Sequence, residues 1–245
     1  MSLFILLLLV HLIADFYLQK DAWIQSKIKY KARSIGLLKH ILTHLALNSI
    51  VLFTMLGFSY LALFALLTIV VSHYAIDIWK TYQGFHLWSF LTDQIAHIVM
   101  LGLVCAYVSE PDLSKWQASF GGFLTLDHLI VLAGFLFAYK PLSLIIQLSL
   151  RRYTQQLEAK TSNQGLENAG EWIGVFERFL VITFVLLGQF AAVGFLLAAK
   201  GVFRFGDMRR EQDRKLTEYI MLGTLLSVGL AIGTGLMLNY LTAHN

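Results

Sequence analysis

Charged residues are scarce in this chain. Asp, Glu, Lys and Arg make up 14% of the 245 residues, whereas hydrophobic residues make up 57% and the mean hydropathy is +0.66. Soluble domains carry about 25% charged residues, so this composition excludes an ordinary soluble protein. Cysteine is scarcer still, because Cys105 is the only one. An intramolecular disulfide and a cysteine-based zinc site are therefore excluded, and nitrogen and oxygen remain as metal ligands.

Long apolar segments are abundant instead. Seven of them approach the roughly 20 apolar residues that a membrane-spanning helix needs. They cover residues 2–18, 37–57, 59–78, 88–108, 122–139, 174–199 and 219–241. We expect an all-α, polytopic membrane helix bundle of six to seven spans. The first segment lacks a basic start and a small-residue cleavage pattern, so we interpret it as a helix of the mature protein and not as a secretion signal.

The basic residues lie in short loops beside these segments. The net charge is +4, and residues 20–39 hold six Lys and Arg against one acid, Asp21. Such loops face the cytoplasm and its anionic lipids, which predicts an N-terminus outside, membrane lipids as partners and no nucleic acid. Residues 20–39 also have apolar side chains near helical spacing, so part of this loop either lies along the membrane surface or is a solvated loop.

The C-terminal third poses a topological conflict. A polar stretch divides the chain into an N-terminal membrane unit, 1–146, a cytoplasmic linker, 147–173, and a C-terminal membrane unit, 174–245. A single span over 174–199 would place the basic residues of 200–215 outside, against the charge rule. Either that span breaks the rule, or a hairpin or re-entrant segment near 174–200, broken around Gly188 and Gln189, returns the chain to the cytoplasm.

Four pairs of polar residues recur inside the first apolar segments, each spaced i,i+4. On a helix this spacing turns by about 40° and rises about 6 Å, so both side chains point the same way. If the spans alternate in direction, all four pairs lie in the same, cytoplasmic, leaflet. The pairs are His11/Asp15, His40/His44, His73/Asp77 and Asp93/His97.

Ionisable groups at membrane depth cost about 2.5 to 3.5 kcal/mol each on insertion scales, so these eight must compensate one another or bind something. Five imidazoles and three carboxylates suit one or two divalent transition metals, zinc first, with manganese or iron as alternatives. A proton or ion relay and a purely structural polar network are the other readings. Gln19, Asn48 and Gln94 lie at the same level as possible partners of the ligands. We do not expect His86, His128, His244 or Asp127 to be ligands.

These motifs resemble a bacterial membrane family known as domain of unknown function 3307. The resemblance is carried by His11-Leu12-Ile13-Ala14-Asp15-Phe16 with Gln19, by His40 and His44, by His73, Asp77 and Lys80, and by Asp93-Gln94 with His97. A C-terminal part often found with the family is similar to Gly174, Glu177-Arg178, Gly194-Phe195, Ala198-Ala199-Lys200, Arg204-Phe205, Glu218-Tyr219 and Gly223-Thr224-Leu225. The His and Asp motifs are more loosely similar to bacterial inner-membrane proteins described as metal-dependent hydrolases.

The pattern as a whole favours an integral-membrane metal-dependent hydrolase of the bacterial inner membrane, acting on a lipid or a phosphate ester. Asp15 or Asp93 would be the general base, and Lys80, Lys200 or Arg204 would receive a phosphate. The alternative is a metal-ion or proton transporter using the same residues, which predicts polar residues in the outer halves of the spans; few are there. A non-catalytic membrane scaffold or sensor is the third hypothesis.

Overall fold

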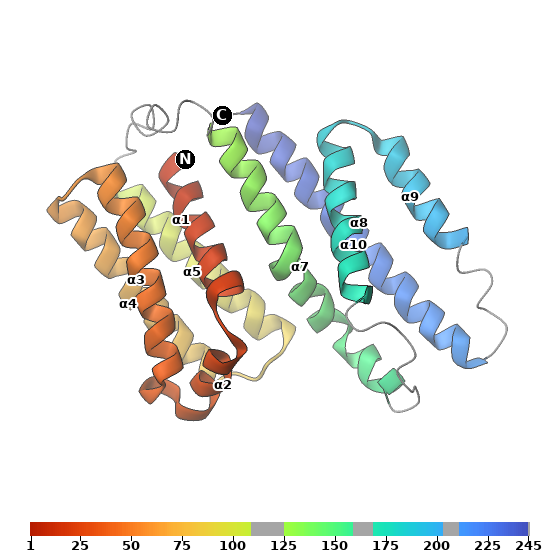
Figure 1. Ribbon diagram of the computed structural model, residues 1–245, viewed down its shortest axis with the longest axis horizontal. Coiled ribbons are helices and arrows are strands. Elements are labelled where there is room, and N and C mark those ends of the chain that lie inside the picture. The colour runs from red at the N-terminus through yellow and green to blue at the C-terminus, as the bar shows by residue number, and fades with distance from the viewer. Residues whose placement is uncertain (109–124, 159–168, 203–210, 245) are drawn as a thin grey trace. The chain divides into compact units, whose positions relative to one another are not determined.

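The computed structural model describes residues 1–108, 125–158, 169–202 and 211–244 (Figure 1). These residues form helices and no strand, which confirms the all-α prediction. The chain divides into two compact units, Met1–Ala133 and Gly134–Asn245. The boundary between these units falls inside one continuous helix, α7 (Leu126–Glu158), which runs through Pro141.

Four helical segments form a ring in the first unit. The segment α1 (Ser2–Leu12), continued by the π-helical turn η1 (Ile13–Leu18), packs against α3 (Ile35–Leu56) and α5 (Leu87–Tyr107), and α4 (Tyr60–Thr81) packs against the same two helices. Serine side chains begin two of these helices, since Ser34 Oγ accepts from the Leu37 N–H at 3.1 Å and Ser59 Oγ from the Ala62 N–H at 3.2 Å. Such caps satisfy backbone donors that the first turn leaves without partners. Short turns join α3 to α4 and α4 to α5, whereas residues 13–34 join α1 to α3, and successive helices of the ring are antiparallel (Figure 1).

An apolar core fills one end of the ring. Its buried side chains come from the start of α1, the end of α3, the first half of α4 and the end of α5, which all lie at the same end of an antiparallel ring. They are Leu3, Leu7, Leu52, Ala65, Leu66, Ile69, Leu101, Val104 and Val108. The polar pairs sit on the other halves of the same helices, so the interior is apolar at one end and polar at the other.

The outward faces of the helices are apolar as well. Ile50, Val71 and Leu103 are more than half exposed, although each lies in the middle part of a helix. Faces of this kind suit contact with lipid. Among the described residues, five helices are long and apolar enough to cross a membrane, or six if Ser2–Leu18 and Asp21–Arg33 count as one bent span. The prediction of six to seven spans included 174–199, which the structure divides between two helices.

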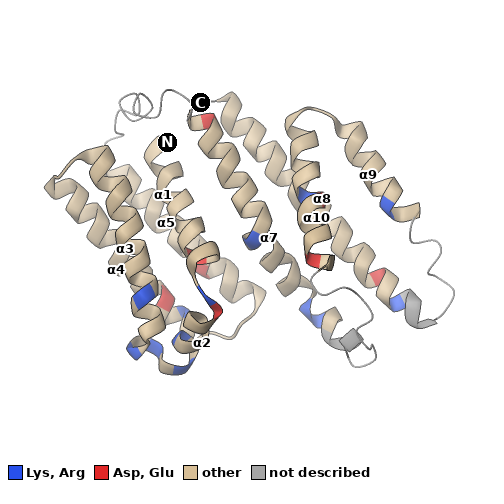
Figure 2. Cartoon of the chain, in the orientation of Figure 1, with Lys and Arg blue, Asp and Glu red and all other residues tan. Residues whose placement is uncertain are grey.

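The helix α2 (Asp21–Tyr30), followed by the 3₁₀ turn η2 (Lys31–Arg33), lies at the polar end of the ring. The chain bends by 89° between η1 and α2, and α2 then packs on α3 and α4. Gly36 permits this approach, because a Cβ there would lie 2.7 Å from the Trp23 Cα. The Lys31 ammonium donates to the carbonyl of Thr81 in α4. Lysine and arginine residues gather around α2 (Figure 2), as the charge pattern of residues 20–39 led us to expect.

The second unit contains the rest of α7 together with α8 (Ala169–Leu186), α9 (Phe190–Val202) and α10 (Glu211–Ala243). The helices α8 and α9 form the expected hairpin, and its turn contains Gly188 with φ of +69°, a conformation that favours glycine. Lys200 Nζ and Glu177 Oε2 lie 2.5 Å apart and tie α9 to α8. The predicted hairpin near 174–200, broken around Gly188 and Gln189, is therefore confirmed.

Pro141 lies inside α7, where a proline removes one backbone hydrogen bond of the helix. Arg178 of α8 supplies donors to this turn of α7. Its Nε donates to the Ala138 carbonyl at 2.8 Å, and its Nη2 donates to the Ser143 hydroxyl. Glu177, the residue before Arg178, pairs with Lys200 of α9. Arg178 thus bonds the carbonyl next to that of Phe137, the one whose backbone donor the proline removes.

Candidate metal centre

The four polar pairs converge in the interior of the first unit. Each ring segment supplies one pair, and seven of the eight side chains belong to buried residues, with Asp15 slightly more exposed. His11 ends α1 and Asp15 lies in η1, a helical form that occurs often at functional sites. The convergence follows from i,i+4 spacing on antiparallel helices, as the sequence predicted.

One carboxylate oxygen, Asp15 Oδ1, lies at the centre of a group of imidazoles. The Nε2 atoms of His44, His40 and His73 lie 2.8, 3.4 and 3.6 Å from it, and His11 Nδ1 lies 3.8 Å away. A carboxylate oxygen has two lone pairs, so it cannot accept hydrogen bonds from four nitrogens. At least two of these four imidazole nitrogens therefore make no hydrogen bond to Asp15 Oδ1, and their lone pairs remain available to a metal ion.

A second set of contacts extends from the same imidazoles toward α5. His40 Nε2 lies 3.1 Å from His73 Nε2 and 3.5 Å from Asp77 Oδ2. His97 Nε2 lies 4.0 Å from Asp77 Oδ1 and 3.5 Å from Asp93 Oδ1. The eight side chains therefore form one continuous cluster and not four separate pairs.

Three groups within this cluster have donor atoms close enough together to hold a metal ion. In each group the donor atoms lie within 4.8 Å of one another. The groups are His11, Asp15, His44 and His73; His40, His73 and Asp77; and Asp77, Asp93 and His97. The first and third groups share no residue. Each offers at least three nitrogen or oxygen donors of the kind that zinc, manganese and iron bind.

Several buried polar atoms of the cluster make no hydrogen bond. They are His40 Nδ1, Asp93 Oδ1, His97 Nε2 and, beside the cluster, Asn48 Oδ1. Buried polar atoms are usually hydrogen-bonded, and leaving one without a partner costs about 1–3 kcal/mol. Asp93 Oδ1 and His97 Nε2 face each other at 3.5 Å without a bond. A carboxylate oxygen and an imidazole nitrogen in this relation fit a shared cation, so the residues fit a metal.

Two lysines contact the outer oxygens of the carboxylates. Lys27 Nζ of α2 donates to Asp77 Oδ2 at 2.7 Å, and Lys80 Nζ donates to Asp93 Oδ2. Lys80 was predicted to receive a phosphate, whereas Lys27 was read as one basic residue of a loop. Lys27 lies among the apolar residues of 23–28, which have near-helical spacing. This position is the sequence signal that could have distinguished Lys27 from the other basic residues of the loop. The cluster contains three carboxylates and two ammonium groups, a balance that favours a further cation.

Gln94 connects two of the candidate ligands. Its Nε2 donates to Asp93 Oδ2 at 3.0 Å, which directs its Oε1 toward His11 Nε2 at 3.2 Å. Because an amide oxygen only accepts, His11 donates from Nε2, and Nδ1 is left as its ligand atom toward Asp15. Contacts of this type fix the tautomer of a metal-binding histidine. Gln94 thus has the geometry expected of a supporting residue.

The other two expected supporting residues are placed differently. Asn48 is buried one turn from His44, and its Nδ2 donates to the His44 carbonyl at 2.8 Å. Gln19 lies after η1, where the backbone becomes extended before α2. Asn48 therefore borders the cluster, whereas Gln19 lies at the bend between η1 and α2.

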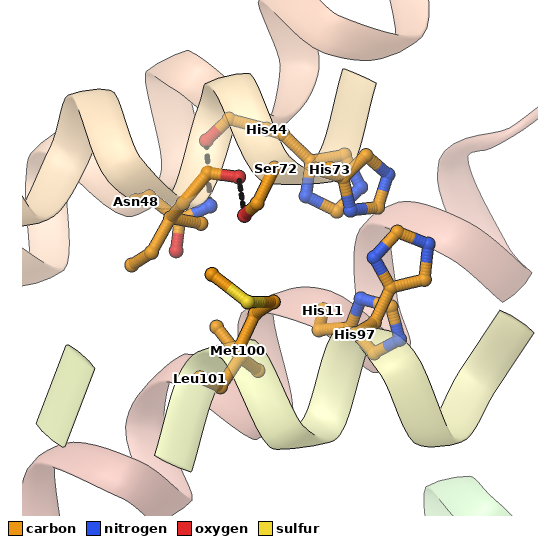
Figure 3. A pocket seen from close by; sticks show the side chains of 9 residues that line it. His11, His44, Asn48, Ser72, His73, His97, Met100 and Leu101 are labelled. Carbon is orange, nitrogen blue, oxygen red and sulfur yellow. Dashed lines mark hydrogen bonds between the residues drawn. The ribbon is translucent and has the colours of Figure 1, made fainter. Parts of the chain in front are cut away.

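A small cavity borders the imidazoles on the side of the apolar core (Figure 3). Its volume is about 10 Å³, close to the least space that holds a single water. Its wall combines imidazoles with apolar side chains, namely His11, His44, His73 and His97 with Asn48, Ser72, Ile69, Met100 and Leu101. Polar and apolar halves of the ring therefore meet directly at the cluster.

The remaining candidates lie elsewhere. Lys200 belongs to the second unit and pairs with Glu177, and Arg204 lies outside the described residues. His86 and His128 are exposed and contact Gly84 and Thr125, and His244 contacts the Tyr240 carbonyl. These three histidines do not enter any of the ligand groups found in the described residues.

Fold and cluster together define a helical membrane protein with His and Asp groups that could hold a metal. The family described as "Protein of unknown function (DUF3307)" matches residues 3–124, so this part of the chain belongs to that family. The match contains all eight cluster residues and ends before the second unit. Comparisons with curated proteins and with solved structures gave no match.

Proposed function

We propose that this chain is an integral-membrane metal-dependent hydrolase whose metal centre is the His and Asp cluster. The observation that carries the proposal is the presence of two ligand groups without a common residue inside one buried cluster. His11, Asp15, His44 and His73 would hold one divalent ion. Asp77, Asp93 and His97 would hold a second, with His40 between the two groups. Zinc is the first candidate, followed by manganese and iron.

A divalent ion at this position would polarise a substrate oxygen and lower the pKa of a bound water. In a centre with a single ion, held by the first group, Asp93 would be free to act as the general base, and it is favoured over Asp15 for that role. Its Oδ1 makes no hydrogen bond, whereas Asp15 Oδ1 is surrounded by imidazoles. Lys80 holds the other oxygen of Asp93, which leaves Oδ1 oriented toward His97.

The lysines suggest the class of substrate. The Lys80 side chain is 30% exposed, compared with 9% for Lys27, so Lys80 is the better placed to meet a substrate that enters from the polar end of the ring. An ammonium group at a metal centre suits a phosphate. We therefore favour a phosphate ester, and a lipid-linked one because the helices present apolar faces on their outside.

The charge pattern supports a location in the bacterial inner membrane with this end toward the cytoplasm and the N-terminus outside. Lys20, Lys27, Lys29, Lys31 and Arg33 all lie in or beside α2 and η2, at the same end as the cluster. Cytoplasmic loops are enriched in Lys and Arg. The site would then open toward the inner leaflet.

The apolar core supports hydrolysis over transport. Transport needs a polar path to both ends of the bundle, whereas Leu7, Leu52 and Leu101 are buried together between the cluster and the other end of the ring. Ile69 of this core also lines the small cavity beside the imidazoles. Among the described residues of the first unit, the eight side chains of the cluster thus lie on one side of an apolar layer.

Metal analysis tests the centre. The full chain, purified in detergent without chelators, should contain one or two equivalents of a transition metal. His44→Ala should lose the ion of the first group and Asp93→Ala that of the second, while His86→Ala, an exposed histidine outside the cluster, should keep the wild-type content. Wild-type protein without any bound transition metal would refute the metal centre.

Activity assays then separate the two metal-dependent functions. Metal-loaded protein in liposomes should hydrolyse a generic phosphoester, and Asp93→Ala should abolish this activity. Flux of the metal across the liposome membrane, without hydrolysis, would support the transporter and contradict the hydrolase.

A further inference from the structure

The second unit contains a cavity that the proposed metal centre does not use. It measures about 760 Å³ and is lined by α7, α8, α9 and α10. Much of its wall is apolar, including Ile146, Leu150, Ile173, Leu196 and Ile220. Its volume falls in the range of about 300–1,000 Å³ that is typical of binding sites for small molecules.

Arg178 is the buried charge of this cavity, with 4% of its surface exposed. Its hydrogen-bond partners are neutral, namely the carbonyls of Ala138 and Tyr139 and the hydroxyls of Ser143 and Ser227. In the described part of the chain no carboxylate lies within 4.0 Å of its guanidinium group. A buried cation without a carboxylate partner is costly unless something else compensates it.

Two carboxylates, Glu171 and Glu177, line the same cavity and attract the Arg178 guanidinium at longer range, but neither contacts it directly. Lys200 and Glu177 pair with each other at 2.5 Å, and Glu171 is exposed in the first turn of α8. Arg178 is therefore a buried cation beside an apolar wall that no carboxylate of the cavity contacts directly.

One nitrogen of Arg178 is available from the cavity. Nη1 carries two hydrogens, and its one hydrogen bond goes to Ser227 Oγ at 3.5 Å, the outer limit for such a bond. Gly174 lies beside it, and a Cβ at this position would lie 3.2 Å from Nη1. Both Gly174 and Ser227 line the cavity. Because Gly174 has no side chain, a ligand can approach Nη1 from inside the cavity.

We propose that this cavity binds an amphiphile with an anionic head group, either a phosphate or a carboxylate. The head group contacts Arg178 Nη1, and the acyl chain lies along the apolar wall between α7 and α10. Guanidinium groups bind phosphate and carboxylate strongly. Both α7 and α10 contain segments long and apolar enough to cross a membrane, so lipid is the ligand at hand. This site is independent of the metal centre, since all of its residues belong to the second unit.

Native mass spectrometry of the full chain in detergent tests the proposal with two matched pairs of probes. Phosphatidylglycerol is compared with diacylglycerol, and palmitate with hexadecanol; each pair shares its chains and differs in the anionic head. In at least one of the two pairs, we expect the anionic probe to be retained at least about tenfold more tightly than its neutral counterpart. Retention of phosphatidylglycerol alone identifies a phosphate head, and retention of palmitate alone identifies a carboxylate.

Substitutions locate the binding. Gly174→Ala places a methyl group against Nη1 and should weaken retention of the anionic probe about tenfold. Gly194→Ala is the control, because a Cβ at this helical glycine meets nothing within 4 Å. Arg178→Gln should also lose the anionic preference; if this variant does not fold, Gly174→Ala still decides. Equal retention of neutral and anionic probes, or unchanged retention by Gly174→Ala, overturns the proposal.

Discussion

The two units of this chain bury charge in opposite ways. In the first unit, carboxylates, imidazoles and ammonium groups share one cluster, and each lysine of the cluster faces a carboxylate. In the second unit, Arg178 is supported by backbone carbonyls and hydroxyls. A cluster in which carboxylates outnumber ammonium groups and stand beside imidazole nitrogens suits a cation, whereas a cation held by neutral acceptors suits an anion. The groups that surround a buried charge thus indicate whether the site binds a cation or an anion.

The largest expected effect comes from breaking the Lys27–Asp77 pair. Asp77→Leu leaves the Lys27 ammonium buried without its carboxylate, which should lower the free energy of unfolding by about 3–5 kcal/mol. Thermal unfolding in detergent measures this loss. The double variant Lys27→Met/Asp77→Leu should recover most of the stability but not the metal content, because Asp77 belongs to two of the three ligand groups. Wild-type metal content in the double variant would exclude Asp77 as a ligand.

The corresponding test in the second unit concerns Arg178 and Pro141. Arg178→Gln removes charge-assisted hydrogen bonds to the proline-containing part of α7 and should cost about 2–3 kcal/mol of stability. Pro141→Ala restores a backbone N–H, so it should recover about 1 kcal/mol in the Arg178→Gln variant and less in the wild type. A double-mutant cycle by thermal unfolding gives the coupling. Additive effects would mean that Arg178 does not compensate for the proline.

A smaller effect should follow from loosening the cluster without removing a ligand. Gln94→Leu removes the acceptor that orients His11, and metal affinity should fall about 10- to 100-fold. Competition with a metal-binding dye measures the affinity. Gln83→Leu, at an exposed glutamine after α4, is the control and should bind as the wild type does. Unchanged affinity in Gln94→Leu would show that His11 needs no support from this amide.

The smallest effect concerns the hairpin of the second unit. Gly188→Ala forces a side chain into a positive-φ conformation and should cost about 1 kcal/mol. Gly194→Ala, inside α9, should leave stability unchanged or raise it by up to about 1 kcal/mol. Chemical denaturation of both variants in detergent compares the two glycines. Equal behaviour would mean that the turn at Gly188 relaxes without strain.

The cluster was predictable because helical spacing and alternation of spans are local rules. The positions of His11, His44 and Asp93 in the sequence were enough to predict that each lies on the same face of its helix as its pair partner. Alternation of the spans then predicted that all of them lie at one depth. The hairpin was predictable for a related reason, since the basic residues after 200 conflicted with a single span. In both cases the sequence contained a regular pattern and one rule was enough to interpret it.

The residues that were missed depend on contacts between distant parts of the chain. Lys27 reaches Asp77 because of the 89° bend before α2, and no periodicity in the sequence encodes that angle. Arg178 reaches a turn 40 residues earlier in the chain. Lys80 was recognised as important, but its partner Asp93 lies on another helix and could not be assigned.

The spread of the cluster over residues 11–97 also constrains how the protein is made. The ring segments leave the ribosome in order, so Asp15 is synthesised with α1 well before His44 and His73 exist. The groups that contain Asp15 and Asp77 with His73 close only when α4 is complete, and Asp93 and His97 are added with α5. Early intermediates therefore carry carboxylates that lack their partners at membrane depth. We therefore expect nascent chains that end before residue 73 to insert poorly, because Asp15 lacks one of its histidine partners in them.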